Sequence, residues 1–210
     1  MARVLHVQAS PRGEESFSIR AARAFLEAYG KAHPGDTVET LDLAADPPPA
    51  FRGDEAAAKM SLLAGRAPAP DQAKAWARVT AVIRRFKTAE KFVFSSPMWN
   101  FSLPYHLKHY LDVLIQPRET FRYTPEGKVE GFLRGRPCML ILARGGRYGP
   151  GSGGEAMDFQ LPYLKAALGF IGLEDIGAIL IEPTVAEGLE VAQKALDSAV
   201  ADARRKASAF

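Results

Sequence analysis

Short apolar runs alternate with longer segments of helical periodicity along this chain, and the alternation restricts its fold more than any other feature. The longer segments carry apolar stripes three and four residues apart, such as Trp76, Val79 and Ile83. Nearly continuous apolar strands are typical of a parallel sheet that helices cover on both faces. We therefore predict an α/β fold with a doubly wound, five-stranded parallel sheet. Its strands are expected at residues 4–9, 37–43, 92–95, 139–143 and 176–181.

Two segments interrupt the alternation. Residues 46–70 are rich in proline and are expected to form a loop around one short helix near residues 55–63. Residues 120–133 combine the strand-like Phe121-Arg122-Tyr123 with the turn signal Pro125-Glu126-Gly127, which predicts a hairpin or flap outside the core. The 210 residues suit one α/β domain, and we expect a single domain over residues 1–210.

Composition excludes several classes of protein. The 27 Lys and Arg residues and 24 Asp and Glu residues are spread along the chain, whereas a nucleic-acid-binding protein usually gathers basic residues on one face. No window approaches the ~20 apolar residues of a membrane span, and the first residues do not have the pattern of a signal peptide. Cys138 is the only cysteine, lies in an apolar run and is expected to be buried. We expect a cytoplasmic protein that binds neither nucleic acid nor membrane.

Ligands of such sheets bind beyond the carboxyl ends of the strands, at the point where the strand order reverses. The loop after the first strand contains Ser10, Ser16, Phe17 and Ser18 and opens a helix. Hydroxyl and backbone N–H groups at a helix start can bind a phosphate; alternatively, Ser16 or Ser18 only caps the helix. The loop has neither Gly-x-Gly-x-x-Gly nor Gly-Lys-Ser/Thr, which argues against a dinucleotide site or a P-loop and favours a monophosphate.

Two further loops lie at the same predicted edge. The loop after the third strand holds Pro97, Met98, Trp99, Asn100 and Phe101, which offer apolar surface and hydrogen bonds to a planar ring. The alternative is that Trp99 and Phe101 pack beneath the next helix, with Ser102 as its cap. The loop after the fourth strand, Ala143-Arg144-Gly145-Gly146, lets the backbone approach a ligand closely, although a merely flexible loop looks similar.

Nearly the whole chain resembles the FMN-dependent NADH-azoreductases, also described as NADH:quinone oxidoreductases, of the flavodoxin-like superfamily. The resemblance includes the three loops and continues beyond them. Its further motifs are Leu107-Lys108-His109-Tyr110-Leu111-Asp112, Thr120-Phe121-Arg122-Tyr123-Thr124, Tyr163-Leu164 and Leu168-Gly169-Phe170-Ile171-Gly172.

The resemblance implies a flavodoxin-like fold that binds FMN and takes hydride from NADH or NADPH in a ping-pong cycle, with quinones or azo compounds as oxidants. Ser10, Ser16, Ser18 and the Phe17 backbone would bind the FMN phosphate. Residues 97–101 would border the flavin ring, and Ala143, Arg144, Gly145 and Gly146 would close its other side. The resemblance also implies a homodimer with a shared pocket, for which Asn100, Phe121 and Tyr123 are the candidate substrate contacts.

The sequence departs from the family pattern at Ala143, where members often carry serine, and Arg147 adds a charge beside the paired glycines. No side chain is predicted to be an obligatory acid or base, because the chemistry would lie on the FMN. His106 and His109 are three residues apart but lack a third ligand, so no metal is predicted. The alternatives are a flavodoxin-type electron carrier and a flavin-free interaction module on the same fold.

Overall fold

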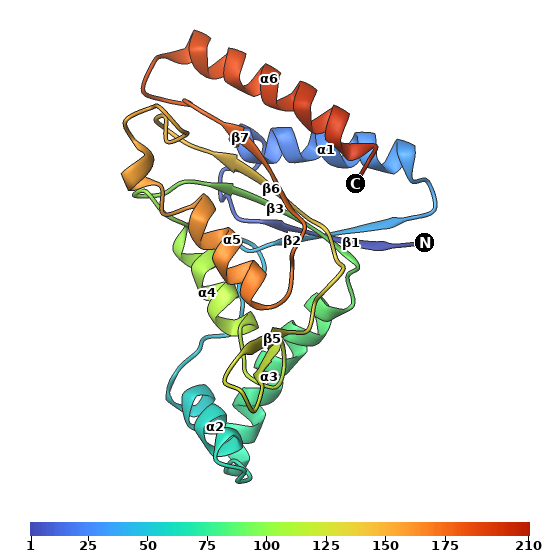
Figure 1. Ribbon diagram of the computed structural model, residues 1–210, viewed down its shortest axis with the longest axis vertical. Coiled ribbons are helices and arrows are strands. Elements are labelled where there is room, and N and C mark those ends of the chain that lie inside the picture. Colours follow the sequence, from blue (N-terminus) through green and yellow to red (C-terminus); the bar gives the residue numbers. More distant parts are fainter.

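The predicted sheet is present in the computed structural model, which describes residues 1–210 (Figure 1). Its five strands are all parallel and lie in the order β2-β1-β3-β6-β7. The order reverses after β1, as in doubly wound flavodoxin-like folds, and creates a switch point between β1 and β3. The strand bounds are β1 Arg3–Gln8, β2 Thr37–Asp42, β3 Lys91–Pro97, β6 Cys138–Ala143 and β7 Ile176–Ile181.

Helices cover both faces of the sheet, as predicted (Figure 1). One face packs against α1 and α6, and the other packs against α3, α4 and α5. Alternation along β6 explains the two layers: Leu140 and Leu142 join the core under α3–α5, whereas Met139 and Ile141 join the core under α1 and α6. The helix bounds are α1 Phe17–Ala32, α2 Gly53–Leu63, α3 Pro70–Lys87, α4 Tyr105–Leu114, α5 Leu161–Phe170 and α6 Leu189–Ala207.

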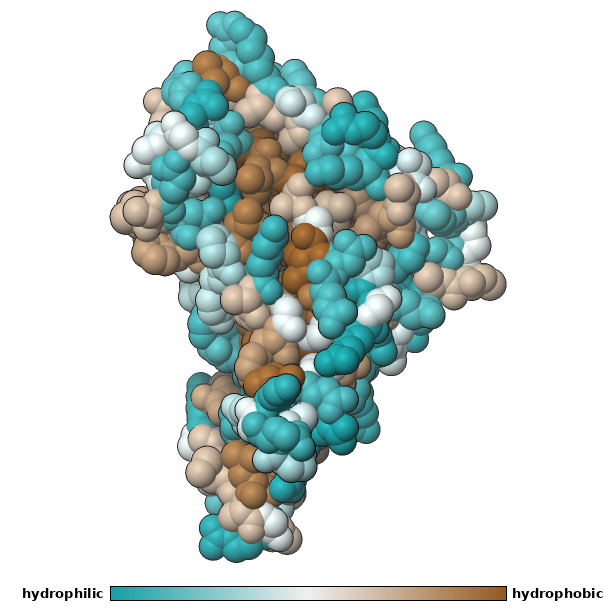
Figure 2. Space-filling view, in the orientation of Figure 1, coloured by the Kyte–Doolittle hydropathy of each residue, from teal (hydrophilic) through white to brown (hydrophobic).

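The two predicted excursions also form as expected. The short helix in the proline-rich segment is α2, which packs against α3 at the protruding end of the molecule, where apolar residues reach the surface (Figures 1 and 2). The second excursion is an antiparallel hairpin of β4, Phe121–Tyr123, and β5, Val129–Gly131. Gly131 lies so close to Ile171 and Gly172 that a Cβ atom would clash with their backbone, so this glycine permits the hairpin to dock beside α5.

Several other features singled out in the sequence can be located in the structure. Cys138 is buried, and burial raises the pKa of its thiol. No helix is both long and apolar enough to cross a membrane. His106 and His109 donate hydrogen bonds to the carbonyl oxygens of Ala9 and Pro49, at 2.9 and 3.0 Å. No group of three or more metal-ligating side chains gathers anywhere in the structure.

Candidate functional site

The three loops that follow β1, β3 and β6 meet in one cavity of about 190 Å³ at the switch point. The carboxyl ends of parallel strands lie at the same edge of the sheet, which brings together segments more than 130 residues apart in the sequence. Predicted residues from all three loops line this cavity: Ser10, Ser16, Phe17, Pro97, Met98, Trp99, Ala143 and Gly145.

The start of α1 supplies unpaired donors to the cavity. Ser16 is the residue before the helix, yet its hydroxyl forms no capping hydrogen bond and instead lies 3.1 Å from the Ser18 hydroxyl. The backbone N–H groups of Phe17, Ser18 and Ile19 have no partner in the protein. Buried or half-buried donors at a helix start carry the positive end of the helix dipole and attract an anion. Ser16 thus occupies the N-cap position of α1 without capping the helix through its hydroxyl, and Ser18 lies inside the helix.

A strained two-residue turn shapes the loop after β3. Trp99 and Ser102 exchange both of their backbone hydrogen bonds, at 3.0 and 2.9 Å. Asn100 and Phe101 between them have φ angles of 46° and 70°, a left-handed pair that favours Asn-Gly and is unusual for phenylalanine. Their side chains stay at the surface: Phe101 is 42% exposed, and the Asn100 amide forms no hydrogen bond.

The alternative interpretation of this loop holds in part for Trp99. Its ring is 37% exposed and packs against Tyr105 and His106 in the first turn of α4, at centroid distances of 6.3 and 5.7 Å. Ser102 does not cap that helix, because Pro104 precedes its first residue and the Ser102 hydroxyl donates to the carbonyl oxygen of Phe159. Trp99 therefore lines the cavity with part of its ring exposed, whereas Phe101 is not among the lining residues and packs against Tyr148, with ring centroids 6.4 Å apart.

Arg144 occupies a different position from its neighbours in the loop after β6. Its side chain is fully buried and forms ion pairs with Asp158, at 2.9 Å, and with Glu182, at 3.3 Å. Its Nε atom donates to Gln160, and Glu182 also accepts the backbone N–H groups of Tyr148 and Gly149. Arg144 thus links the glycine-rich loop to the segments before α5 and after β7, while its side chain is unavailable to a ligand.

Arg147, the other basic residue of this loop, lies at the surface. Its guanidinium forms two hydrogen bonds with the Glu187 carboxylate, at 2.6 and 2.9 Å, and this contact lowers the pKa of Glu187. The charge that the sequence places beside the paired glycines is therefore locally compensated.

Thr184 and Val185 also line the cavity, and the sequence analysis missed them. They follow β7, and their backbone N–H groups donate to the carbonyl oxygens of Arg144 and Gly145. The signal that could have found them is their position directly after the fifth strand, at the same edge of the sheet as the other three loops.

None of the three predicted substrate residues, Asn100, Phe121 and Tyr123, is among those that line the cavity. Phe121 is 6% exposed and packs against Phe170, with ring centroids 4.6 Å apart. Tyr123, two residues further along β4, is 65% exposed. Of this pair, only Tyr123 therefore offers its ring to a neighbouring molecule.

The fold and cavity define a flavodoxin-like protein with unpaired N–H donors at the start of α1 and the Trp99 ring in the cavity lining. A family model described as the flavodoxin-like fold matches residues 2–207. The chain is 45% identical to the FMN-dependent NADH:quinone oxidoreductase of Nitratidesulfovibrio vulgaris (strain DP4) over 210 residues, which is 100% of both chains.

Solved structures agree with this relationship. A crystal structure of azoreductase from Bacillus anthracis str. Sterne is 31% identical, with a TM-score of 0.89 and coverage of 100% of both chains. An FMN-dependent NADH-azoreductase from Bacillus anthracis str. Ames Ancestor, in complex with FMN, is 31% identical, with a TM-score of 0.84 and coverage of 99% of this chain and 100% of that chain. The chain belongs to the family of FMN-dependent NADH:quinone oxidoreductases and NADH-azoreductases.

Proposed function

We propose that this protein is an FMN-dependent NAD(P)H oxidoreductase that transfers hydride from NADH to quinones and azo compounds. The observation that carries the proposal is the meeting of the three loops in one cavity, with unpaired donors at the start of α1 and the partly exposed Trp99 ring in the lining. The names of the relatives supply the cofactor, the donor and the two classes of oxidant.

The residues present fit FMN. The unpaired N–H groups at residues 17–19, with the hydroxyls of Ser10, Ser16 and Ser18, would hold the phosphate, because they can donate hydrogen bonds to its oxygens at the positive end of the helix dipole. Met98, Trp99, Asn100 and Phe101 would border the ring. Ala143 and the backbone of Gly145 and Gly146 would close the other side, with Thr184 and Val185 beside them.

FMN supplies the redox chemistry when bound, by passing hydride between NADH and the oxidant. The protein's part is to orient the ring and to keep water from one of its faces. The backbone N–H groups of Gly145 and Gly146 have no partner in the protein, so they can donate hydrogen bonds toward a ligand in the cavity.

A homodimer with a shared pocket is the second part of the proposal. Pockets for small molecules usually occupy roughly 300–1,000 Å³, and the cavity of one chain is smaller, at about 190 Å³. A second subunit would complete the enclosure, and Tyr123 is the better candidate for its contribution because Phe121 is buried. A cytoplasmic location belongs to the same proposal, because NADH is an intracellular reductant.

Steady-state kinetics test the proposed function. NADH oxidation should require both FMN and a benzoquinone, and double-reciprocal plots at several quinone concentrations should give parallel lines. A protein that binds FMN but oxidises NADH no faster than free FMN is a carrier of the flavodoxin type.

Comparison of wild-type protein with Tyr123→Ala at varied protein concentration tests the shared pocket: the variant should raise the KM for quinone and leave FMN affinity unchanged.

A further inference from the structure

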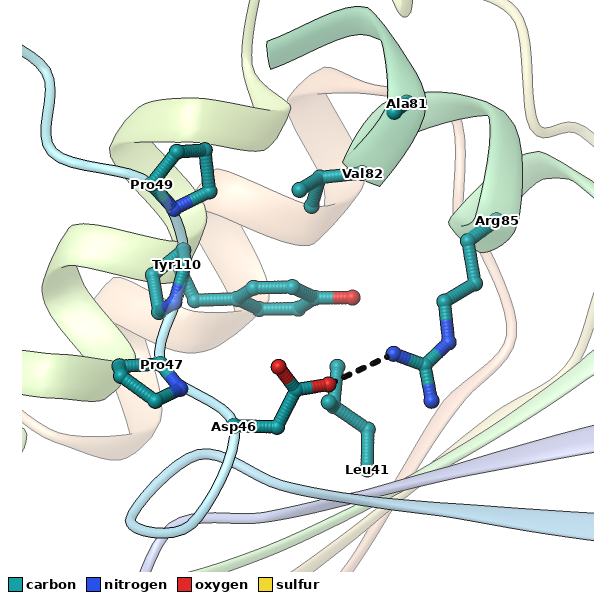
Figure 3. A pocket seen from close by; sticks show the side chains of 9 residues that line it. Leu41, Asp46, Pro47, Pro49, Ala81, Val82, Arg85 and Tyr110 are labelled. Carbon is teal, nitrogen blue, oxygen red and sulfur yellow. Dashed lines mark hydrogen bonds and ion pairs between the residues drawn. The ribbon is translucent and has the colours of Figure 1, made fainter. Parts of the chain in front are cut away.

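A second pocket of about 240 Å³ lies away from the proposed FMN site, between the proline-rich segment after β2 and the helices α3 and α4 (Figure 3). It shares no lining residue with the cavity at the switch point. Pro47 and Pro49 form one wall, Ala81 and Val82 of α3 form the opposite wall, and Tyr110 of α4 lies between them (Figure 3).

The Tyr110 hydroxyl is the polar group that faces this pocket. Its side chain is 1% exposed, and its hydroxyl forms no hydrogen bond with any protein group; the oxygen is not one of the fully buried unpaired atoms and faces the open space of the pocket. Figure 3 shows this hydroxyl pointing into the pocket, toward the side of Val82 and Arg85. Burial raises the pKa of Tyr110, so the hydroxyl stays protonated and can donate a hydrogen bond. Tyr29, another tyrosine that is fully buried, donates its hydroxyl to Asp36, which shows how such a group is ordinarily satisfied.

The charges at the pocket cancel one another. Arg85 donates from Nε to Glu39, at 2.7 Å, and from Nη1 to Asp46, at 3.0 Å. Arg3 lies 3.6 Å from the same Glu39 carboxylate, so two cations face two carboxylates. An ion entering the pocket would lose hydration without meeting a net opposite charge, which favours an uncharged ligand.

We propose that this pocket binds a small uncharged ring compound that carries a carbonyl oxygen. The Tyr110 hydroxyl donates to the carbonyl, and the ring lies between the proline wall and Val82. Asp46 at the rim accepts an N–H group where the compound has one, which makes an aromatic carboxamide the best match. This site is additional to the proposed oxidoreductase function and does not depend on it.

Benzamide is a suitable probe, because it has one ring, one carbonyl and an N–H donor and is not a hydride acceptor of the quinone or azo class. Titration of the full chain, saturated with FMN, would be followed by the amide resonances of ¹⁵N-labelled protein. The shifts should gather at Asp46, Ala81, Val82 and Tyr110 and should saturate with a Kd on the order of 1 mM, as befits a one-ring fragment.

Two variants test the pocket from different sides. Tyr110→Phe removes only the hydroxyl and should weaken binding by about three- to tenfold, the worth of one neutral hydrogen bond. Ala81→Met fills the pocket from the surface of α3 and should weaken binding at least as much. Ala77→Met is the matched control, because Ala77 is exposed one turn earlier on the same helix and does not line the pocket.

The outcomes are distinct. Loss of affinity in Tyr110→Phe and Ala81→Met, with Ala77→Met unchanged, supports the site. Absence of saturable binding overturns the proposal, as does binding that both pocket variants leave unchanged. Shifts that gather at residues 98–101 instead would assign the probe to the cavity at the switch point and would also overturn it.

Discussion

Replacement of Arg144 by methionine should destabilise this protein far more than replacement of Arg147, three residues away. The Arg144 side chain is fully buried, and the side chains of its partners Asp158 and Glu182 are only 9% and 16% exposed. Arg144→Met removes the one cation of this cluster and leaves two carboxylates close together without a counter-charge. Breaking a buried ion pair in this way costs about 3–5 kcal/mol.

The loss is measurable by urea denaturation of the apoprotein, with the free energy of unfolding extrapolated to water. For a chain of this length each kcal/mol lowers Tm by about 2–4 °C, so a fall of roughly 6–20 °C is expected. Arg147→Met is the matched control, because Arg147 and Glu187 are about half exposed and their ion pair is screened by water.

FMN affinity should fall together with stability in Arg144→Met. Glu182 accepts the N–H groups of Tyr148 and Gly149, and the Arg144 carbonyl accepts from Thr184, so the cluster holds the wall of the cavity in place. If Arg144→Met lowers the free energy of unfolding no more than Arg147→Met does, the buried cluster does not hold this wall of the cavity in place. If stability falls and FMN affinity does not, the wall contributes nothing to binding.

Three further predictions follow from local geometry. Ser16→Ala should weaken FMN binding by about three- to tenfold and leave the urea midpoint of the apoprotein unchanged, because the hydroxyl does not cap α1. Phe101→Gly should stabilise the apoprotein by about 1 kcal/mol, since φ of 70° suits glycine, and should raise the KM for quinone. Burial lowers the pKa of His6 from 6.5 to about 4. Between these pH values the His6 imidazole is neutral in the folded protein and protonated in the unfolded chain. Stability should therefore fall by up to about 3 kcal/mol as the pH drops from 6.5 to 4, and His6→Gln should flatten this slope in denaturation measured across that range.

The strands and helices follow from local periodicity, which explains why the layers and the two excursions could be predicted. The position of the three loops followed from a general rule about parallel sheets. The roles of individual side chains depend on partners distant in the sequence. Arg144 turns away from the cavity because Asp158 and Glu182 are buried beside it, and nothing in its own loop indicates this.

Backbone dihedral angles and the burial of individual side chains could not be predicted from the sequence either. The sequence Asn100-Phe101 does not indicate a left-handed turn, because phenylalanine is rare in that conformation. Phe121 and Tyr123 are two residues apart and point to the same face of β4, so alternation does not distinguish them; only the packing of Phe121 against Phe170 does. Thr184 and Val185 escaped attention because they have no distinctive chemistry and line the cavity through their position alone.

The central claim is that the three loops form one FMN site at which NADH delivers hydride. The most direct measurement is to saturate the purified protein with FMN, remove the excess, exclude oxygen and follow the visible flavin absorbance after adding NADH. We expect rapid bleaching and full return of the colour when a benzoquinone is added. Loss of FMN during removal of the excess would contradict the three-loop site, and retained FMN that neither NADH nor NADPH bleaches would contradict the oxidoreductase.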